Sequence, residues 1–415
     1  MQNITLNKNL NFFIQALIFL TPIGAIVIRG WVNLFMFILL FISIYIWAKQ
    51  KKEFIGEVNK TEKYMFSFFI FYFLILIVAI LVHLENPDIG RNIEAGLRFI
   101  LIIPIYLLFK KISKIEKLLV YGMILSIVTA FLYSVYDLYI LGLPNAVGQY
   151  FEIIVGNETA MFMLVLLVAI PQIIKNKKIQ YPIIILIVIL SLWVVYAADN
   201  RSGFLVVLVG FSLFFILKFK PIISFLTIAF LMLSSIIAYN NVTTIKTSAG
   251  EAINNTIEYF QSKNINDEVR LTSAGIRFEM WRTTPYFLTD SIIIGSGLSS
   301  YERISRQLVD KKIINKEVSH HSRPHNLFIE NLMFKGILGL ISILLVVFYP
   351  LWIFIRDYKL AKQTAMMGIL LQTSVIVQSL TESVIYRGAY VISYFFVLSI
   401  ILIWHQRAIK TNAKK

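Results

Sequence analysis

Residues 64–83 have the sequence YMFSFFIFYFLILIVAILVH, which contains no Lys, Arg, Asp or Glu. A helix needs about 20 apolar residues to cross the hydrocarbon core of a membrane, so this stretch predicts a transmembrane helix. The whole 415-residue chain is 58% hydrophobic and 15% charged, whereas soluble domains carry about 25% charged residues. This composition excludes an ordinary soluble protein, and the absence of cysteine excludes disulfides and thiol chemistry.

Similar apolar runs recur along the chain, and together they predict an all-α polytopic membrane protein with about twelve transmembrane helices. The expected spans lie near residues 10–28, 31–48, 64–83, 96–109, 118–140, 158–174, 181–198, 203–217, 221–239, 333–355, 361–379 and 388–405. Three regions are predicted in this order: nine N-terminal transmembrane helices in 1–239, one large periplasmic loop with short helices in 240–326, and three C-terminal transmembrane helices with a cytoplasmic tail in 327–415.

The basic residues of the connections test this series, because Lys and Arg collect in the cytoplasmic loops of membrane proteins. Alternate connections are rich in them: Lys49, Lys51, Lys52, Lys60 and Lys63; Lys110, Lys111, Lys114 and Lys117; Lys175, Lys177 and Lys178; Lys218 and Lys220; Arg356, Lys359 and Lys362; and the tail Arg407, Lys410, Lys414 and Lys415. The alternation predicts an even number of spans with both termini in the cytoplasm. The net charge of +16 is therefore an orientation signal and does not indicate an anionic substrate.

The long connection at 240–326 falls on the outer face in this topology. A loop of this length is usually either functional or disordered. Its Trp281 and Phe287 favour an ordered, partly buried loop, and helices are expected at Glu251–Gln261 and Arg277–Leu288.

Three polar patches on the outer face are candidates for chemistry. The first, Asp199-Asn200-Arg201-Ser202-Gly203, is a tight turn between two apolar helices. Arg201 either anchors a helix end at the membrane surface, as snorkelling arginines do, or extends its guanidinium into a polar cleft to bind a phosphate bidentately.

The second patch has the sequence SAGIRFEMW at residues 273–281. Arg277 is expected near the start of a helix, where free backbone N–H groups and the helix dipole favour an anion. The alternative is an arginine on a helix surface that faces solvent.

The third patch, SRPHNLFIEN at residues 322–331, ends the loop. Pro324 and Asn326 are typical of a helix start, which would place His325 at the tip of a helix at the membrane surface. A histidine there can act as a general base near neutral pH, and Glu330, one turn further on, can approach the same cleft. Alternatively, Asn326 simply caps the helix and His325 is solvated.

Other classes of site lack support in the sequence. His320, His321 and His325 do not have a recognised ligand spacing, so no metal and no cofactor is predicted. A Gly-rich phosphate loop and a nucleophile elbow are both missing. The lysines are spread over short loops instead of one folded face, which argues against nucleic-acid binding.

At the three patches the chain resembles the O-antigen ligase family of bacterial inner membranes, part of the O-antigen ligase/polymerase superfamily. Residues 199–203 are similar to the family's arginine turn and 274–281 to its loop motif. Residues 324–339, PHNLFIENLMFKGILG, are similar to its most specific stretch, a His-Asn pair followed by a helix and paired glycines. Thr381-Glu382-Ser383 and Arg387 match a weaker polar turn, and the first half of the chain matches only in hydropathy.

The resemblance implies a metal-independent, GT-C-like glycosyltransferase in lipopolysaccharide biosynthesis, acting among membrane lipids at the periplasmic face of the inner membrane. Such an enzyme transfers a saccharide from undecaprenyl pyrophosphate to a sugar hydroxyl of lipid A–core, and one-step attack would invert the anomeric configuration. Carried over to this chain, Arg201 and Arg277 hold the donor pyrophosphate and His325 is the catalytic residue at the acceptor hydroxyl. Asn326, Glu330 and Arg387 are the supporting residues.

Three other functions stay open at this point. An O-antigen polymerase of the same superfamily uses a lipid-linked glycan as acceptor, but only the loop at 240–326 is large here, which favours a ligase. A protein-glycosylating ligase differs in an acceptor that these residues do not specify. A polysaccharide flippase or other transporter usually has internal repeats and ionisable residues near the bilayer midplane, and both are scarce in this chain.

Overall fold

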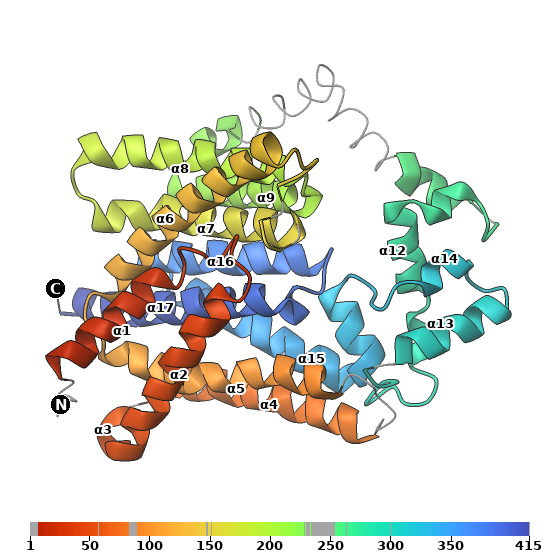
Figure 1. Ribbon diagram of the computed structural model, residues 1–415, viewed down its shortest axis with the longest axis horizontal. Helices are drawn as coiled ribbons and strands as arrows, with labels where there is room; N and C mark the ends of the chain where they lie inside the picture. Colours follow the sequence, from red (N-terminus) through yellow and green to blue (C-terminus); the bar gives the residue numbers. More distant parts are fainter. Residues whose placement is uncertain are drawn as a thin grey trace.

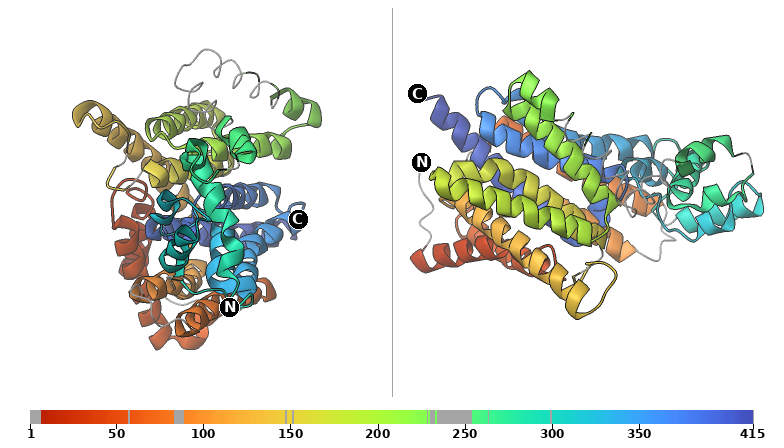
Figure 2. Two further views of the ribbon diagram at one scale, coloured as in Figure 1. Left: turned by 90° about the vertical axis from the view of Figure 1, so that its right-hand side faces the viewer. Right: turned by 90° about the horizontal axis from the view of Figure 1, so that it is seen from above.

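The structure is a computed structural model that describes residues 7–56, 58–82, 89–146, 148–150, 152–227, 229, 233, 254–262, 264–298 and 300–414. Every regular element among these residues is a helix, which confirms the all-α prediction. The helices form a bundle with a smaller helical unit at one end, and both termini lie at the opposite end of the bundle (Figures 1 and 2).

Within the described residues, nine helices are long and apolar enough to cross a membrane, so the chain is a multi-pass membrane protein. They coincide with nine of the expected spans. They are α2 (Trp31–Lys49), α4 (Lys60–Val82), α5 (Ile89–Lys111), α6 (Ile115–Val135) with the π-helix η1 (Tyr136–Ile140), α7 (Glu152–Ile173), α8 (Lys177–Ala197), α9 (Arg201–Lys218), α15 (Leu327–Arg356) and α17 (Gly388–Asn412).

The other three expected spans differ for separate reasons. α1 (Lys8–Leu20) is too short to span, because the chain turns at Thr21 and Pro22 instead of continuing the helix to residue 28. α16 (Lys362–Ser379) is long enough, but glutamine, serine and threonine side chains lower its hydropathy. The expected span 221–239 lies mostly outside the described residues, which include a helical turn at 221–227.

Helix α7 is at the centre of the bundle. Its best spanning segment is 94% buried, and it packs against α6, α8, α9 and α16. Apart from Asn157, Glu158 and Thr159 its buried residues are apolar, and a helix that is apolar on most sides belongs in the interior of a helical assembly. Of the two helix starts that matter for the site, Arg201 begins α9, which packs directly on α7, and Leu327 begins α15, which packs on α16.

The unit at the end of the bundle, here called the loop unit, comprises the described residues of 254–326. It contains a helix over 254–261. Its other elements are η2 (Glu268–Leu271), α12 (Ser273–Arg282), η3 (Thr284–Phe287), α13 (Ser300–Asp310) and α14 (Lys316–Ser319). Met280, Phe287, Tyr301 and Leu308 form its apolar core together with Phe334 from α15.

The loop unit confirms that the long connection contains helices, but their bounds differ from those expected. Residues 251–253 lie outside the described part, so the first helix is seen only from 254. The second begins at Ser273, where the Thr272 hydroxyl accepts a hydrogen bond from the Gly275 N–H at 3.2 Å. It ends at Arg282, before a 3-10 turn that contains Pro285. Arg277 therefore lies in the second turn of α12 and not at its start.

Helix α15 is broken at Gly336, whose φ of 63° and ψ of −159° are not helical. The loop segment 292–297 fills the break. The N–H groups of Ile337 and Leu338 donate to the carbonyls of Ile292 and Ile293 at 2.9 and 3.2 Å. The N–H groups of Ser296 and Gly297 donate to the carbonyls of Met333 and Phe334 at 3.0 Å each. These backbone hydrogen bonds join the loop unit to the bundle.

Candidate active site

The candidate residues meet at the end of the bundle that faces the loop unit. Arg201 is the first residue of α9, Arg277 belongs to α12, and His325 lies two residues before α15. Glu382 and Arg387 lie on either side of η4 (Val384–Tyr386), in the turn between α16 and α17. The Trp281 indole N–H donates a hydrogen bond to the carbonyl of Pro324, and the charge of Arg201 acts on Arg277, so the three patches lie at the same end of the bundle.

His325 is held in a strained backbone conformation with φ of 50°, a region that few non-glycine residues adopt. On its C-terminal side, the Asn326 side chain accepts hydrogen bonds from the N–H groups of Phe328 and Ile329 at 3.0 and 3.1 Å, and so caps α15. The Asn326 amide also donates to the carbonyl of Leu380 at 3.1 Å, which ties the cap to the end of α16. The helix-cap prediction is thus confirmed.

The histidine side chain is also held, so the alternative of a freely solvated imidazole does not fit. His325 Nδ1 lies 3.2 Å from Glu382 Oε2, and the His325 side chain is 27% exposed. A carboxylate only accepts hydrogen bonds, so this contact favours the tautomer with the proton on Nδ1. Nε2 then keeps its lone pair for a proton from another group.

Glu382 is itself fixed as a carboxylate. It accepts a hydrogen bond from the Ser383 N–H at 3.0 Å and lies 3.5 Å from the Arg387 guanidinium. Burial alone would raise the pKa of Glu382, but the hydrogen bond and charge of His325, with Arg387 and the Ser383 N–H, hold that pKa below its ordinary value. The pair of His325 and Glu382 therefore has the arrangement of a base and its orienting carboxylate.

Arg201 and Arg277 differ from the other arginines of the site. Among the described residues neither one forms an ion pair with a carboxylate, whereas Arg323 and Arg387 are paired with Glu330 and Glu382. Arg277 makes only a long hydrogen bond of 3.5 Å to the Ser273 hydroxyl. Burial lowers the pKa of Arg277; the charge of Glu382 opposes that change and the charge of Arg201 adds to it. Two guanidiniums whose charges act on each other, and neither of which forms an ion pair with a carboxylate of the described residues, make a site that an anion would stabilise.

Arg201 is presented to this site by its own helix cap. The Asn200 side chain accepts hydrogen bonds from the N–H groups of Ser202 and Gly203 at 3.0 and 3.2 Å. The Asn200 amide also donates to the carbonyl of Ile153 at 2.8 Å, which anchors the turn to α7. Arg201 itself is exposed, so the rigid turn leaves its guanidinium accessible at the positive end of α9.

Glu330 has a different position from the one expected. It is completely buried, with one carboxylate oxygen 2.6 Å from Arg323 Nη1 and the other hydrogen-bonded to the Ser383 hydroxyl. It therefore does not offer a carboxylate to the cleft. Because Arg323 precedes His325 and Ser383 follows Glu382, the buried pair links the two chain segments that carry the base and its partner.

Two contacts of the site have little signal in the sequence. Glu382 is separated from His325 by 57 residues, and only the family resemblance pointed to its turn. The Trp281 indole N–H donates to the carbonyl of Pro324 at 2.8 Å, so α12 also braces the residue before His325. Apart from that resemblance, the sequence signals the contact of His325 with Glu382 only by placing a carboxylate in a short turn between two apolar helices.

The three histidines 320, 321 and 325 do not gather as ligands. His321 and His325 lie with ring centroids 5.8 Å apart. Burial lowers the pKa of His321, and the charges of His325, His320 and Arg277 lower it further. In the part of the chain that the structure describes, no group of three or more His, Cys, Asp or Glu side chains is arranged around a possible metal position.

Part of the chain is similar to a known protein family. Residues 186–344 match a family model described as O-antigen ligase. This segment is similar to O-antigen ligase domains. It contains Arg201, Arg277 and His325, whereas Glu382 and Arg387 lie beyond its C-terminal limit. The resemblance inferred from the three motifs is thereby confirmed, and O-antigen ligase domains belong to glycosyltransferase-like enzymes that use lipid-linked glycans in a membrane.

The similarity also extends beyond the O-antigen ligase domain. A protein of Haemophilus influenzae, described as uncharacterized, is 26% identical over 358 residues. The aligned region covers 84% of this chain and 86% of that protein. An alignment of this length extends well beyond residues 186–344, into parts of the chain that have no motif.

Proposed function

We propose that the protein is a metal-independent, inverting glycosyltransferase that moves a saccharide from undecaprenyl pyrophosphate to lipid A–core in lipopolysaccharide biosynthesis. The observation that carries the proposal is the contact of His325 with Glu382, with the charges of Glu382 and Arg201 both acting on Arg277 and no ion pair to either arginine among the described residues. The two arginines suit an anionic leaving group, and the pair of His325 and Glu382 suits an acceptor hydroxyl.

The arginines would act on the donor. Cleavage of the bond between the anomeric carbon and the phosphate oxygen leaves the bonding electrons on undecaprenyl pyrophosphate. Two fixed positive groups stabilise this growing charge in the transition state, so no acid needs to protonate the leaving group. The position of Arg201 at the end of a spanning helix would let the polyprenyl tail remain among the spans.

His325 would act on the acceptor. Nε2 takes the proton of a sugar hydroxyl while the hydroxyl oxygen forms a bond to the anomeric carbon, on the face opposite to the departing phosphate. Glu382 then accepts a hydrogen bond from Nδ1 of the imidazolium that forms. A single displacement of this kind inverts the anomeric configuration. Asn326, Glu330 and Arg387 hold these two residues through the contacts described above.

The topology that goes with this function is a multi-pass protein of the bacterial inner membrane with cytoplasmic termini and a periplasmic loop unit. Two observations support it. Lysine-rich connections alternate with lysine-poor ones, and the two termini lie at the end of the bundle opposite the site (Figure 1). The boundaries 1–239, 240–326 and 327–415 are part of the same proposal.

The decisive experiment uses the purified full chain with a labelled lipid-linked glycan and a chelator. The acceptor is lipid A–core in one arm and a second lipid-linked glycan in the other. Transfer to the core is the expected result. Growth of the glycan on its lipid would instead identify a polymerase, and transfer in neither arm would favour a transporter.

Variants of the site test the assignment of residues. His325→Ala is expected to reduce the transfer rate by roughly 10²–10⁴-fold, the usual contribution of a general base. Arg277→Ala should reduce it by roughly 10²–10³-fold, as removal of a group that stabilises transition-state charge does. Arg303→Ala removes an exposed arginine of α13 and is the control. Full transfer by the His325 variant would refute the assignment.

A further inference from the structure

A groove of about 670 Å³ lies in the loop unit, beside the candidate active site. α13 and α14 pack against each other (Figure 1), and both contribute side chains to the lining of the groove. Its lining includes Glu302, Arg306 and Asp310 from α13 and Lys316 from α14. The volume is within the range of about 300–1,000 Å³ that is usual for ligand sites. None of these residues has a part in the chemistry proposed above.

One wall of the groove is a regular helical face. Glu302, Arg306 and Asp310 recur at every fourth position of α13 and therefore share one side of the helix. Tyr301, Ile304 and Leu308 cover the other side and are buried in the core of the loop unit. The polar wall is thus fixed by apolar packing behind it.

The inner end of the groove reaches the site. His321 and Ser322 line the groove, and the ring of His321 stands nearly perpendicular to that of His325, 5.8 Å away. The charge of Arg277 also acts on His321. A chain that occupies the groove can therefore extend to the reacting centre without crossing the loop unit.

The lining indicates the chemistry of the occupant. Two carboxylates, Glu302 and Asp310, balance two cationic side chains, Arg306 and Lys316, so the groove does not select an ion of either sign. His320, His321 and the serines add both donors and acceptors. Such a lining suits a neutral chain of hydroxyl groups. An apolar tail would require a surface like the groove on α15, which is lined by Ile341, Leu344 and Phe348.

We infer that the groove between α13 and α14 is a saccharide-binding subsite that holds several sugar units next to the reacting hydroxyl and anomeric carbon. This inference rests on the proposed function, because it takes His325 and Arg277 as the reacting centre. A polyhydroxylated chain of the donor glycan and one of the acceptor core share the required chemistry. Their sources are separated by experiment.

The test measures binding without turnover. The full chain carrying His325→Ala, in detergent, is titrated with two lipid-free probes: the oligosaccharide released from the lipid-linked donor, and the core oligosaccharide released from lipid A. One of the two is expected to bind, and the one that binds identifies the source. Undecaprenyl phosphate without sugar should not compete with it. Competition by that lipid, or no binding of either oligosaccharide, overturns the inference.

A matched pair of variants locates the binding. Arg306→Trp fills the groove, whereas Arg303→Trp places the same bulk on an exposed position of α13 outside the lining. The first should weaken oligosaccharide binding by roughly ten-fold or more, equivalent to about 1.4 kcal/mol, and the second should leave it unchanged. Equal effects would overturn the inference. If the oligosaccharide binds in the groove but His325→Ala still transfers, the proposed function fails by itself.

Discussion

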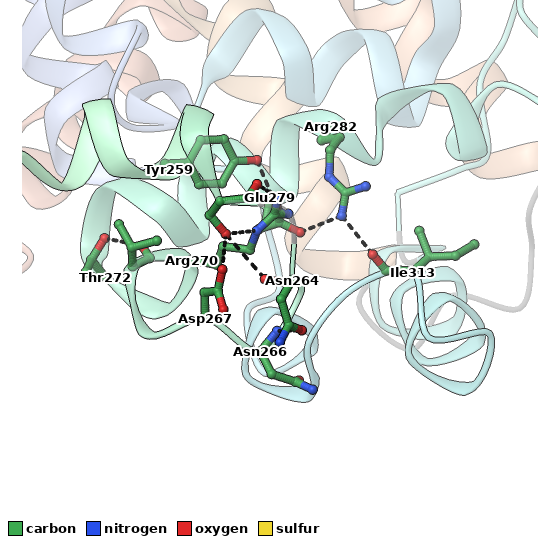
Figure 3. A network of polar contacts seen from close by, with 11 residues as sticks. Tyr259, Asn264, Asn266, Asp267, Arg270, Thr272, Glu279, Arg282 and Ile313 are labelled. Atoms are coloured by element: carbon green, nitrogen blue, oxygen red, sulfur yellow. Dashed lines mark hydrogen bonds and ion pairs between the residues drawn. The ribbon is translucent and has the colours of Figure 1, made fainter.

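Helix α7 in the bundle buries its Glu158 without an ion pair to any described residue, whereas α12 in the loop unit buries a carboxylate that several neighbouring groups compensate. Glu279 is 1% exposed and receives hydrogen bonds or ion pairs from Arg270 at 2.7 Å, Arg282 at 2.6 Å and Tyr259 at 2.8 Å (Figure 3). Most of the bundle core is apolar packing, and the loop unit combines a smaller apolar core with a compensated buried carboxylate. The candidate active site lies between these two regions and takes residues from both.

The largest expected effect separates the two regions. Glu279→Ala leaves Arg270 buried at 11% exposure without its carboxylate, and breaking a buried ion pair costs about 3–5 kcal/mol. The loop unit should unfold and become sensitive to protease, while the bundle stays inserted. The contact between Glu302 and Arg306 is the matched control, because both side chains are exposed. Glu302→Ala should cost less than about 1 kcal/mol. Equal proteolysis of both variants would contradict the comparison.

The next effect concerns the contact that crosses between the regions. Glu382→Gln keeps the size of the side chain but removes the carboxylate that holds His325 Nδ1. We expect the transfer rate to fall by roughly 100-fold, about 2.7 kcal/mol, with little change in thermal stability. Glu94→Gln is the control, because it changes an exposed carboxylate of α5 whose partner is Arg98 and not His325. A rate equal to that of the unchanged protein would remove Glu382 from the mechanism.

The lowered pKa of Glu382 predicts the pH below which its contribution is lost. The pKa of Glu382 in the folded protein is below its ordinary value of 4.5. Its stabilising contribution is therefore complete above pH 4.5 and is lost only as the pH falls through the lower, folded value. Any loss of activity of the unchanged protein between pH 5 and 7 should persist in Glu382→Gln. A loss in that interval that disappears in the variant would contradict this sign.

A smaller effect is expected at the join itself. A Cβ on Gly336 would lie 2.4 Å from the carbonyl carbon of Ile293, and the backbone there has a conformation that only glycine adopts readily. Gly336→Ala should therefore destabilise the protein by about 1–3 kcal/mol, measured as a lower thermal midpoint. Gly90→Ala in α5 is the control, since a Cβ at that position meets nothing within 4 Å. Equal midpoints would show that the break tolerates a side chain.

The smallest effect compares the two arginines across the junction. Arg201→Lys, from the bundle, and Arg277→Lys, from the loop unit, both keep the positive charge but lose the planar fork that can bind two phosphate oxygens. We expect each to reduce transfer by roughly ten-fold, about 1.4 kcal/mol. The control Arg303→Lys should leave the transfer rate unchanged. A lysine that replaces either arginine without loss would indicate a point charge instead of bidentate recognition.

The sequence predicts these regions unequally, for physical reasons. Runs such as 64–83 form spans because a long apolar helix has few alternatives in a membrane, and their positions could be predicted. The cap at Asn326 is equally local and was also predictable. The contact of His325 with Glu382, in contrast, depends on how α15 and α16 pack, which no local pattern encodes. For the same reason Glu330 was expected in the cleft but is buried against Arg323.

The break at Gly336 also changes where the loop unit should be divided from the membrane region. Met333 and Phe334 belong to the apolar core of the loop unit, although they are part of α15. The part of α15 before Gly336 thus belongs to the loop unit, and the part after Gly336 belongs to the bundle. Chimaeras that exchange the loop unit between related proteins, in order to exchange their acceptor preference, should therefore join the two sequences at Gly336 and not at residue 326. Insertions before this glycine would rotate His325 by about 100° per residue, whereas those after it would move the loop unit as a whole.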